Sequence, residues 1–207
     1  MDSVETEEIV PGAFVLRDFA TLSAESLLLA VQSVADRSPF RRIVTPSGKA
    51  MSVEMTNCGS YGWTSDHRGY RYEKTDPKTG IEWPTLPVEL EIIAKSAARR
   101  AGYLGFEPDV CLINRYETGS SMGLHQDRDE RDFTQPIVSV SLGLSIRFRM
   151  GGDSRTGKTK AITLCHGDVV VFGGPARLAF HGVGKLPNGI HPLTGTRRIN
   201  LTFRRAI

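Results

Sequence analysis

Apolar residues recur at the spacing of an α-helix in two segments of the chain. Over residues 23–38 they follow a serine and stop before Pro39, and over residues 87–102 they follow Pro87 and stop at Gly102. A serine N-cap, a proline in the first turn and a glycine after the last turn are common helix boundaries. We therefore predict two helices, each with one apolar face.

The pattern changes to that of β-strands from residue 110 onwards, and one further strand is predicted near the N-terminus. These strands are short, and glycine-rich turns separate several of them. They comprise residues 13–16, 110–116, 137–144, 146–150, 161–165, 169–172 and 198–204. Many short strands with such turns favour an antiparallel barrel or jelly roll, here covered on one side by the two helices.

Polar and apolar residues alternate strictly along the last predicted strand, so one face is polar and the other apolar. The polar face holds Arg198, Asn200, Thr202 and Arg204. Two interpretations stay open here. In the first, the polar face of a half-exposed strand meets water.

In the second interpretation, the polar face lines the interior of a barrel. Two buried arginines then need anionic partners, because an unpaired buried charge is very unfavourable. A dicarboxylate would satisfy both, since the planar guanidinium group binds a carboxylate through two hydrogen bonds. Asn114 and Tyr116, two residues apart on another predicted strand, are candidates for additional neutral hydrogen bonds.

His125 and Asp127 are two residues apart, so in an extended segment their side chains point the same way. His181 offers a third ligand. Two histidines and one carboxylate on one side of a metal are typical of non-haem iron(II) oxygenases. The alternative is that His125 begins a solvated charged loop at residues 127–132.

His166 and Asp168 have the same spacing as His125 and Asp127. Gly167 between them and the apolar run that follows favour a turn into a buried strand, with Asp168 binding turn amides. The spacing alone does not exclude this pair as the metal site.

Composition narrows the class of protein. A chain of 207 residues with 40% apolar residues can form one sizeable core, and we expect residues 13–207 to be a single domain behind an acidic, flexible tail at 1–12. Three widely spaced cysteines predict neither a disulfide framework nor a zinc finger, which fits the cytoplasm. No apolar run approaches the roughly 20 residues of a membrane span. The net charge of +3 permits a nucleic-acid partner without requiring one.

The segment at about 40–86 interleaves aromatic and basic residues. Aromatic rings stack on bases while cations bind phosphates, so this segment is a candidate for binding single-stranded or extruded nucleotides. The alternative is a lid of hairpins whose rings pack on the core. Its larger side chains are Met51, Met55, Tyr61, Trp63, Tyr70, Tyr72 and Trp83, with Arg41, Arg42, Lys49, Arg68, Arg71 and Lys74 among them.

Seven segments in one order give the chain a family resemblance. They are Ser-Pro-Phe-Arg at 38–41, the block at 51–59, Cys-Leu-Ile-Asn-Arg-Tyr at 111–116, Leu-His-Gln-Asp at 124–127, and the blocks at 136–144, 166–171 and 200–204. The chain resembles the AlkB family of iron(II)- and 2-oxoglutarate-dependent nucleic-acid demethylases. This resemblance implies an α+β, mainly β fold with a double-stranded β-helix (jelly-roll) core at about 110–207, two buttressing helices and a nucleotide-recognition lid at about 40–86.

The resemblance also implies roles for individual residues. Iron(II) is assigned to His125, Asp127 and His181, which leaves the pair at 166 and 168 outside the metal site. The two carboxylates of 2-oxoglutarate, the cosubstrate, are assigned to Arg198 and Arg204, and further contacts to it are assigned to Asn114, Tyr116 and Asn200.

For the nucleic-acid substrate, the resemblance implies that Trp63 stacks on the damaged base and that Tyr70 lies beside it in the lid. Asp129 and Glu130 are assigned to the cationic base, and Arg155 is a cation near it. Other lid or pocket positions are Thr45, Met51 and Met55. The chain departs from the family pattern at Arg71, Arg128, Arg131 and Phe172, and these differences concern substrate preference.

The implied reaction uses O2 to demethylate N1-methyladenine and N3-methylcytosine, and it releases formaldehyde, succinate and CO2. Single-stranded DNA is the expected substrate, with RNA as the second candidate, and a monomer is expected. Two other functions stay open: a 2-oxoglutarate-dependent hydroxylase of a protein or small molecule, and a jelly-roll binding module that holds structural zinc.

Overall fold

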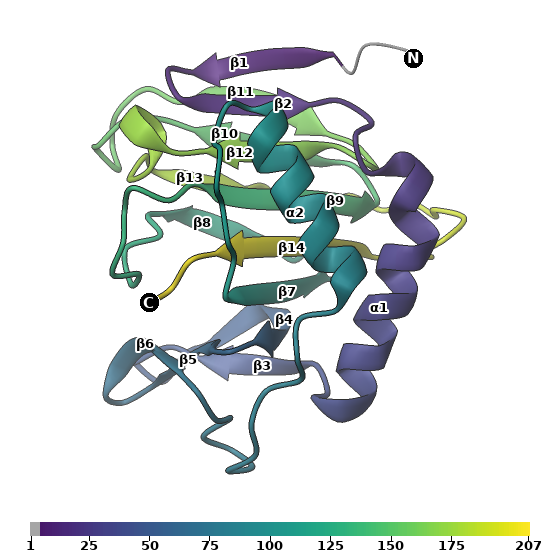
Figure 1. Cartoon of the computed structure of the whole chain (residues 1–207), viewed down its shortest axis with the longest axis vertical. Helices are drawn as coiled ribbons and strands as arrows, with labels where there is room; N and C mark the ends of the chain where they lie inside the picture. Colours follow the sequence, from purple (N-terminus) through teal and green to yellow (C-terminus); the bar gives the residue numbers. More distant parts are fainter. Residues whose placement is uncertain (1–4) are drawn as a thin grey trace.

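The computed structural model describes residues 5–207, which form two facing β-sheets with two helices on one side (Figure 1). The larger sheet has the order β1-β2-β12-β9-β14-β7-β4-β3. Its strands are β1 Thr6–Val10, β2 Ala13–Leu16, β3 Arg41–Val44, β4 Ala50–Gly59, β7 Val110–Tyr116, β9 Ile137–Gly143, β12 Val169–Phe172 and β14 Arg198–Arg204.

The smaller sheet has the order β11-β10-β13-β8, and a separate hairpin joins β5 to β6. These strands are β8 Met122–His125, β10 Ile146–Met150, β11 Lys160–Leu164, β13 His181–Val183, β5 Gly62–Asp66 and β6 Gly69–Glu73. All strand pairs are antiparallel. The mainly β fold with two helices agrees with the jelly-roll expectation.

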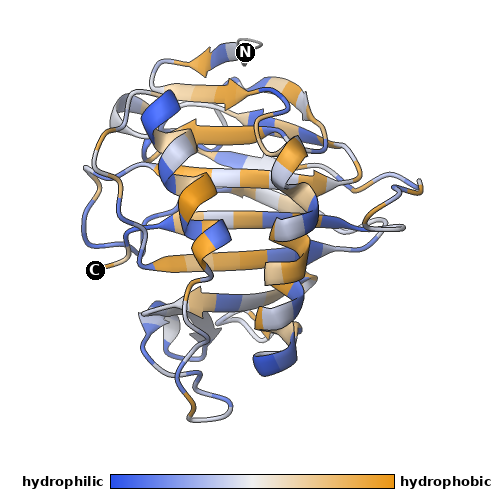
Figure 2. Ribbon diagram, turned by 45° about the vertical axis from the view of Figure 1, so that its right-hand side comes forward, coloured by the Kyte–Doolittle hydropathy of each residue, from blue (hydrophilic) through white to orange (hydrophobic). Residues whose placement is uncertain are grey.

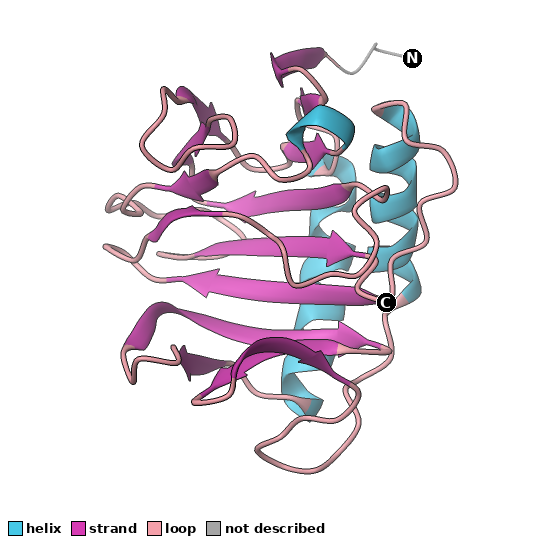
Figure 3. Cartoon of the chain, turned by 90° about the vertical axis from the view of Figure 1, so that its left-hand side faces the viewer, coloured by secondary structure: helices cyan, strands magenta, loops and turns pink. Residues whose placement is uncertain are grey.

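Two helices cover one face of the larger sheet. They are α1 Ala24–Arg37 and α2 Val88–Arg100, and Figure 3 shows both running behind the strands. Their apolar faces pack against the apolar side of β14, so Leu27 and Leu90 share a core with Leu201. The strands that the helices cross are predominantly hydrophobic in Figure 2. Neither α-helix in residues 5–207 is long and apolar enough to cross a membrane.

Leu27→Ala should lower the free energy of unfolding by about 3 kcal/mol, because it leaves a cavity at a site with 0% exposure. Urea unfolding followed by circular dichroism measures the change. Leu29→Ala is the matched control on the same helix, since Leu29 is 72% exposed and its truncation should change stability by less than about 0.5 kcal/mol. Equal losses in both variants would contradict this packing.

The alternation along β14 places its polar face between the two sheets. All seven residues of this strand are buried, including Arg198 at 2% and Arg204 at 6% exposure. The interior interpretation is therefore confirmed, and the half-exposed strand is wrong. A second apolar cluster surrounds this polar strip and includes Phe148 and Phe172.

The structure corrects two boundaries. The expected flexible tail at 1–12 is wrong for Thr6–Val10, because these residues form β1 and pair with β2, while residues 1–4 lie outside the described residues. The core predicted at about 110–207 also includes part of the lid at about 40–86. Its strands β3 and β4 belong to the larger sheet, where β4 pairs with β7, and only the β5–β6 hairpin stands apart.

Candidate active site

A cavity of about 500 Å³ lies between the two sheets and extends to the β5–β6 hairpin. Every site residue predicted from the sequence lines it except Thr45. Thr45 instead stabilises the turn between β3 and β4, where its hydroxyl accepts a hydrogen bond from the Lys49 amide at 3.1 Å. Thr45 therefore does not line the cavity, and its contact with the substrate from the lid stays a prediction.

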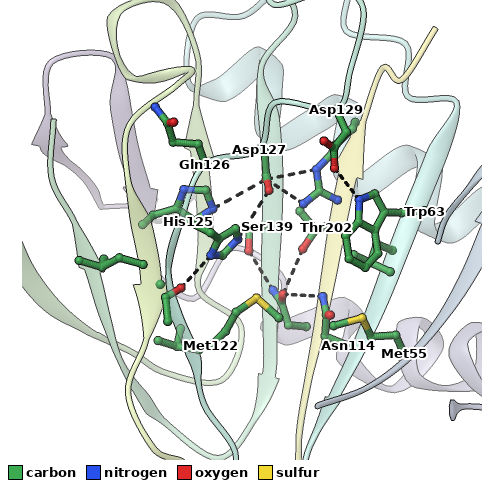
Figure 4. A pocket seen from close by; sticks show the side chains of 18 of the residues that line it. Met55, Trp63, Asn114, Met122, His125, Gln126, Asp127, Asp129, Ser139 and Thr202 are labelled. Atoms are coloured by element: carbon green, nitrogen blue, oxygen red, sulfur yellow. Dashed lines mark hydrogen bonds and ion pairs between the residues drawn. The ribbon is translucent and has the colours of Figure 1, made fainter. Parts of the chain in front are cut away.

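His125, Asp127 and His181 meet at the centre of this cavity, as Figure 4 shows for the first two. The β8–β13 pairing brings the two histidines together, since His181 lies opposite His125 in the ladder. One ligand atom from each residue lies within 4.8 Å of the others. The carboxylate oxygens of Asp127 are 3.6 Å from Nε2 of His125 and 3.7 Å from Nε2 of His181.

Backbone carbonyls orient both imidazole rings. Nδ1 of His125 is 2.9 Å from the carbonyl of Gly123, and Nδ1 of His181 is 3.0 Å from the carbonyl of Ala179. A carbonyl only accepts hydrogen bonds, so each Nδ1 carries the proton and each Nε2 lone pair points toward Asp127. This tautomer is the one that binds a metal through Nε2.

Burial sets the charge states of the three residues. Burial, together with the neighbouring His125, lowers the pKa of His181 to about 4. Burial on its own would raise the pKa of Asp127, but Arg204 and the two histidines together outweigh this effect and hold that pKa below its usual range. A neutral imidazole and an ionised carboxylate are the forms that bind metal ions.

The arginines of β14 present unused donors to the cavity. Arg198 donates from one terminal nitrogen to the Ser141 hydroxyl at 2.9 Å, while its Nε and other terminal nitrogen have no partner. Arg204 binds Asp127 at 2.7 Å and keeps one terminal nitrogen without a partner. Buried cationic donors without acceptors fit an anionic ligand with two charged ends.

Neutral polar groups fill the space between the two arginines. Asn114 donates to the Asn200 side-chain oxygen at 3.3 Å, and its own side-chain oxygen has no partner. Thr202 also donates to Asn200, at 3.0 Å. Tyr116 lies under Arg198, whose guanidinium carbon is 5.0 Å from the ring centroid. The alternating pattern of β14 had already pointed to Thr202 as part of this polar face.

Glu130 lines the cavity, and its carboxylate is also part of a buried ion-pair cluster. Its side chain is 2% exposed and pairs with Arg177 at 3.0 Å and with Arg204 at 3.3 Å. The Tyr72 hydroxyl donates to the same carboxylate at 2.6 Å. Glu130 therefore borders the cavity but is committed to a buried ion-pair cluster.

Arg177 and Tyr72 were not predicted as site residues. Arg177 also donates to the backbone carbonyl of Asp127 at 2.8 Å, so it fixes the chain beside that residue. Nothing in the sequence around Arg177 marks it, because it follows a short turn rather than a periodic segment. Tyr72 was visible only as one of several aromatic residues in the segment at 40–86.

Two aromatic rings of the β5–β6 hairpin lie at the mouth of the cavity. Trp63 and Tyr70 are stacked, with centroids 5.3 Å apart and planes inclined by 13°. The indole nitrogen of Trp63 donates to Asp129 at 2.8 Å, a contact drawn in Figure 4. Arg155 lines the cavity from an exposed loop, and Met51 and Met55 line it from β4.

The competing pair at 166 and 168 serves a turn. The Asp168 carboxylate accepts hydrogen bonds from the Cys165 amide at 2.9 Å and from Arg17 at 2.7 Å. Nδ1 of His166 accepts a hydrogen bond from the Gly143 amide at 3.0 Å. The prediction that Asp168 binds turn amides is confirmed.

The model of the 2OG-Fe(II) oxygenase superfamily matches residues 12–204. The chain belongs to this superfamily. It is 52% identical over 200 residues to the alpha-ketoglutarate-dependent dioxygenase AlkB of Salmonella typhimurium, covering 97% of this chain and 93% of that protein. It is 30% identical over 224 residues to the DNA N(6)-methyladenine demethylase ALKBH1D of Arabidopsis thaliana, covering 95% of this chain and 50% of that protein.

The solved structure of OsALKBH1 has the same fold, with a TM-score of 0.84, 28% sequence identity and coverage of 97% of this chain and 100% of that chain. The superfamily resemblance and the AlkB-type fold predicted from the sequence are therefore confirmed. The protein is an iron(II)- and 2-oxoglutarate-dependent dioxygenase. The two histidines and one carboxylate are the donor set that iron(II) takes in such enzymes.

Proposed function

We propose that the protein reverses alkylation damage by oxidative demethylation of N1-methyladenine and N3-methylcytosine in nucleic acid. Single-stranded DNA is the preferred substrate and RNA the second. The observation that carries this proposal is the stacked Trp63–Tyr70 pair at the mouth of a cavity centred on the His-Asp-His cluster. The matched protein named as a DNA demethylase supports the same substrate class.

Within this proposal, His125, Asp127 and His181 hold iron(II), and Arg198 and Arg204 hold the carboxylates of 2-oxoglutarate. When bound, iron(II) and 2-oxoglutarate supply the oxidation of a substrate C–H bond by O2, with succinate and CO2 as coproducts. The orientation of each Nε2 toward Asp127 and the free donors of Arg198 support these roles. Asn114, Tyr116 and Asn200 orient the cosubstrate between the arginines.

The hairpin aromatics receive the base. An enzyme that acts on a base atom inside a duplex must extrude the nucleotide, and a methylated base that pairs poorly is easier to extrude. Trp63 offers the stacking surface, and its hydrogen bond to Asp129 fixes the indole plane. Hydroxylation of the N-methyl group then releases formaldehyde and restores the base.

One experiment tests the activity directly. A single-stranded oligonucleotide with one 1-methyladenine is incubated with protein, iron(II), 2-oxoglutarate and ascorbate, and mass spectrometry follows the oligonucleotide. We expect the loss of one methylene mass only when every component is present. Succinate formation with an unchanged oligonucleotide would instead identify a hydroxylase of another substrate.

The two acids beyond the metal ligands should behave differently. Asp129→Asn should reduce kcat/KM for cationic 1-methyladenine about tenfold more than for neutral ethenoadenine, because exposed Asp129 offers its charge at the mouth. Glu130→Gln should reduce turnover of both lesions by similar factors, because it disturbs the cluster around Arg177 and Arg204. Competition between the two lesions in one reaction, quantified by mass spectrometry, gives the ratio. If Glu130→Gln instead reduced turnover of the cationic lesion selectively, Glu130 and not Asp129 would be the acid that recognises the charge of the base.

We also propose that the chain from β1 onwards acts as one catalytic domain, as a monomer in the cytoplasm. The cysteines Cys58, Cys111 and Cys165 are all free, which supports a reducing compartment. Light scattering during size-exclusion chromatography tests the monomer.

A further inference from the structure

The outer face of the smaller sheet carries two arginines that no acid neutralises. Arg147 and Arg149 lie on β10 and are exposed, while Ile146, Phe148 and Met150 of the same strand point into the core. Among residues 5–207, neither arginine has an ion pair or a side-chain hydrogen bond. Some other surface arginines, such as Arg71 and Arg197, do pair with acids.

The residues directly opposite these arginines in the two neighbouring strands carry no charge. On one side, Arg147 lies opposite Thr163 and Arg149 opposite Ala161 in β11. On the other side, Arg149 lies opposite Gly182 in β13. These neighbours have small, uncharged side chains, so both guanidinium groups are accessible from solvent. The following loop at 151–159 adds Arg155 and Lys158 against one acid, Asp153, which keeps the local charge positive.

The topology connects this face to the mouth of the cavity. The strand β8 forms one edge of the smaller sheet, and its residue Gly123 lines the cavity together with Gly182 of β13. Gly123 is exposed, and a Cβ atom placed on it would meet nothing within 4 Å. Two strand spacings of ~4.8 Å separate β8 from β10. A nucleic-acid strand that leaves the cavity across β8 therefore reaches Arg149 after about 10 Å.

We propose that the outer face of β10 is a second nucleic-acid contact, in which Arg147 and Arg149 bind the phosphates of the strand that flanks the extruded base. The inference rests on the proposed function, because it extends the same substrate away from the base pocket. Arginine suits this role, since its guanidinium group binds phosphate oxygens bidentately and without regard to sequence. Glycine at position 123 leaves room for a backbone to cross the sheet edge.

The flanking strand reaches β10 on only one side of the lesion, either 5′ or 3′. This dependence on direction makes the contact testable. Two single-stranded oligonucleotides carry 1-methyladenine two nucleotides from the 5′ end or from the 3′ end, so that nearly all flanking phosphates lie on one side. Binding is measured by fluorescence anisotropy with iron(II) and 2-oxoglutarate under anaerobic conditions, across a range of salt. Threonine suits exposed strand positions, so Arg147→Thr with Arg149→Thr removes the charges and keeps the strand.

The double variant should bind one of the two probes about 5- to 20-fold more weakly at low salt and the other within about twofold of the unmodified protein. For the affected probe, the slope of log K against log salt should fall by about 1.4, the value for two single-strand phosphate contacts. Arg37→Thr with Arg99→Thr removes the same charge from the helices and is the matched control. Unchanged binding of both probes by the double variant would overturn the proposal. So would equal losses of affinity for both probes, if the control variant shows the same losses.

A trinucleotide with the same lesion separates this inference from the proposed function. It is too short to reach β10, so both the unmodified protein and the double variant should demethylate it equally well. Absence of demethylation in both proteins would refute the proposed function, whereas the anisotropy data decide the role of Arg147 and Arg149 in either case.

Discussion

Asp127→Ala is expected to reduce the rate of demethylation by at least about 100-fold. Loss of a residue that only orients a metal ligand costs up to about 100-fold, and loss of a ligand itself should cost at least as much. Asp127 is the only carboxylate of the His-Asp-His cluster, and Arg204 keeps it ionised through a 2.7 Å ion pair. Its loss removes an anionic ligand and leaves a buried guanidinium group without its partner. Succinate formation and oligonucleotide mass, measured over an iron(II) titration, report the effect.

Asp129→Ala is the matched control for this variant. Asp129 is exposed and two residues away, and its partner is Trp63 rather than either histidine. This control should keep iron-dependent succinate formation while changing oligonucleotide turnover. Urea unfolding of Asp127→Ala shows whether the unpaired Arg204 also lowers stability. Near-normal succinate formation by a folded Asp127→Ala would mean that the metal lies elsewhere.

The best predictions from the sequence concern residues whose surroundings follow from strand geometry. Arg198 and Arg204 share a face because strand residues alternate, and His125 and Asp127 share one for the same reason. The sequence alone left the direction of these faces open. The structure shows which way each face points, because the whole of β14 is buried and β8 pairs with β13. Both features depend on contacts between segments that are distant in the sequence.

The errors have physical causes of the same kind. An acidic N-terminal segment has the composition of a tail, but Thr6–Val10 gains order from backbone pairing with β2, which composition does not encode. Glu130 lies in a charged run, and the burial of its side chain was not predicted. Its burial depends on Arg177, a residue 47 positions further along the chain with no local pattern to reveal it.

Thr45 shows that family resemblance can place a residue in the right region without predicting what its side chain contacts. The segment at 40–86 does contribute Trp63, Tyr70, Met51 and Met55 to the cavity. Thr45 belongs to the same segment but lies in the tight turn after β3, where its hydroxyl is used by the turn itself. Short polar side chains often bind nearby backbone in turns, and this local use competes with a role in a site.

Arg198→Met should raise the KM for 2-oxoglutarate about 100-fold or more, with little change in oligonucleotide affinity. Arg198 is buried and has two unpaired donor atoms, and hydrogen bonds from charged groups contribute about 1.5–3 kcal/mol each. Two such bonds to one carboxylate account for a change of this size. Succinate formation at varied 2-oxoglutarate measures the KM, and anisotropy measures the oligonucleotide.

Arg197→Met is the matched control, because Arg197 is adjacent in sequence, half exposed and paired with Glu117 at 2.7 Å. Its KM for 2-oxoglutarate should stay within about twofold of the unmodified protein, as expected for an exposed ion pair. Stability separates loss of binding from loss of structure. Replacing a buried cation without an anionic partner by an apolar side chain of similar length is neutral or stabilising, so Arg198→Met should unfold no earlier than the unmodified protein. An unchanged KM in this folded variant would assign the 2-oxoglutarate carboxylates to other residues.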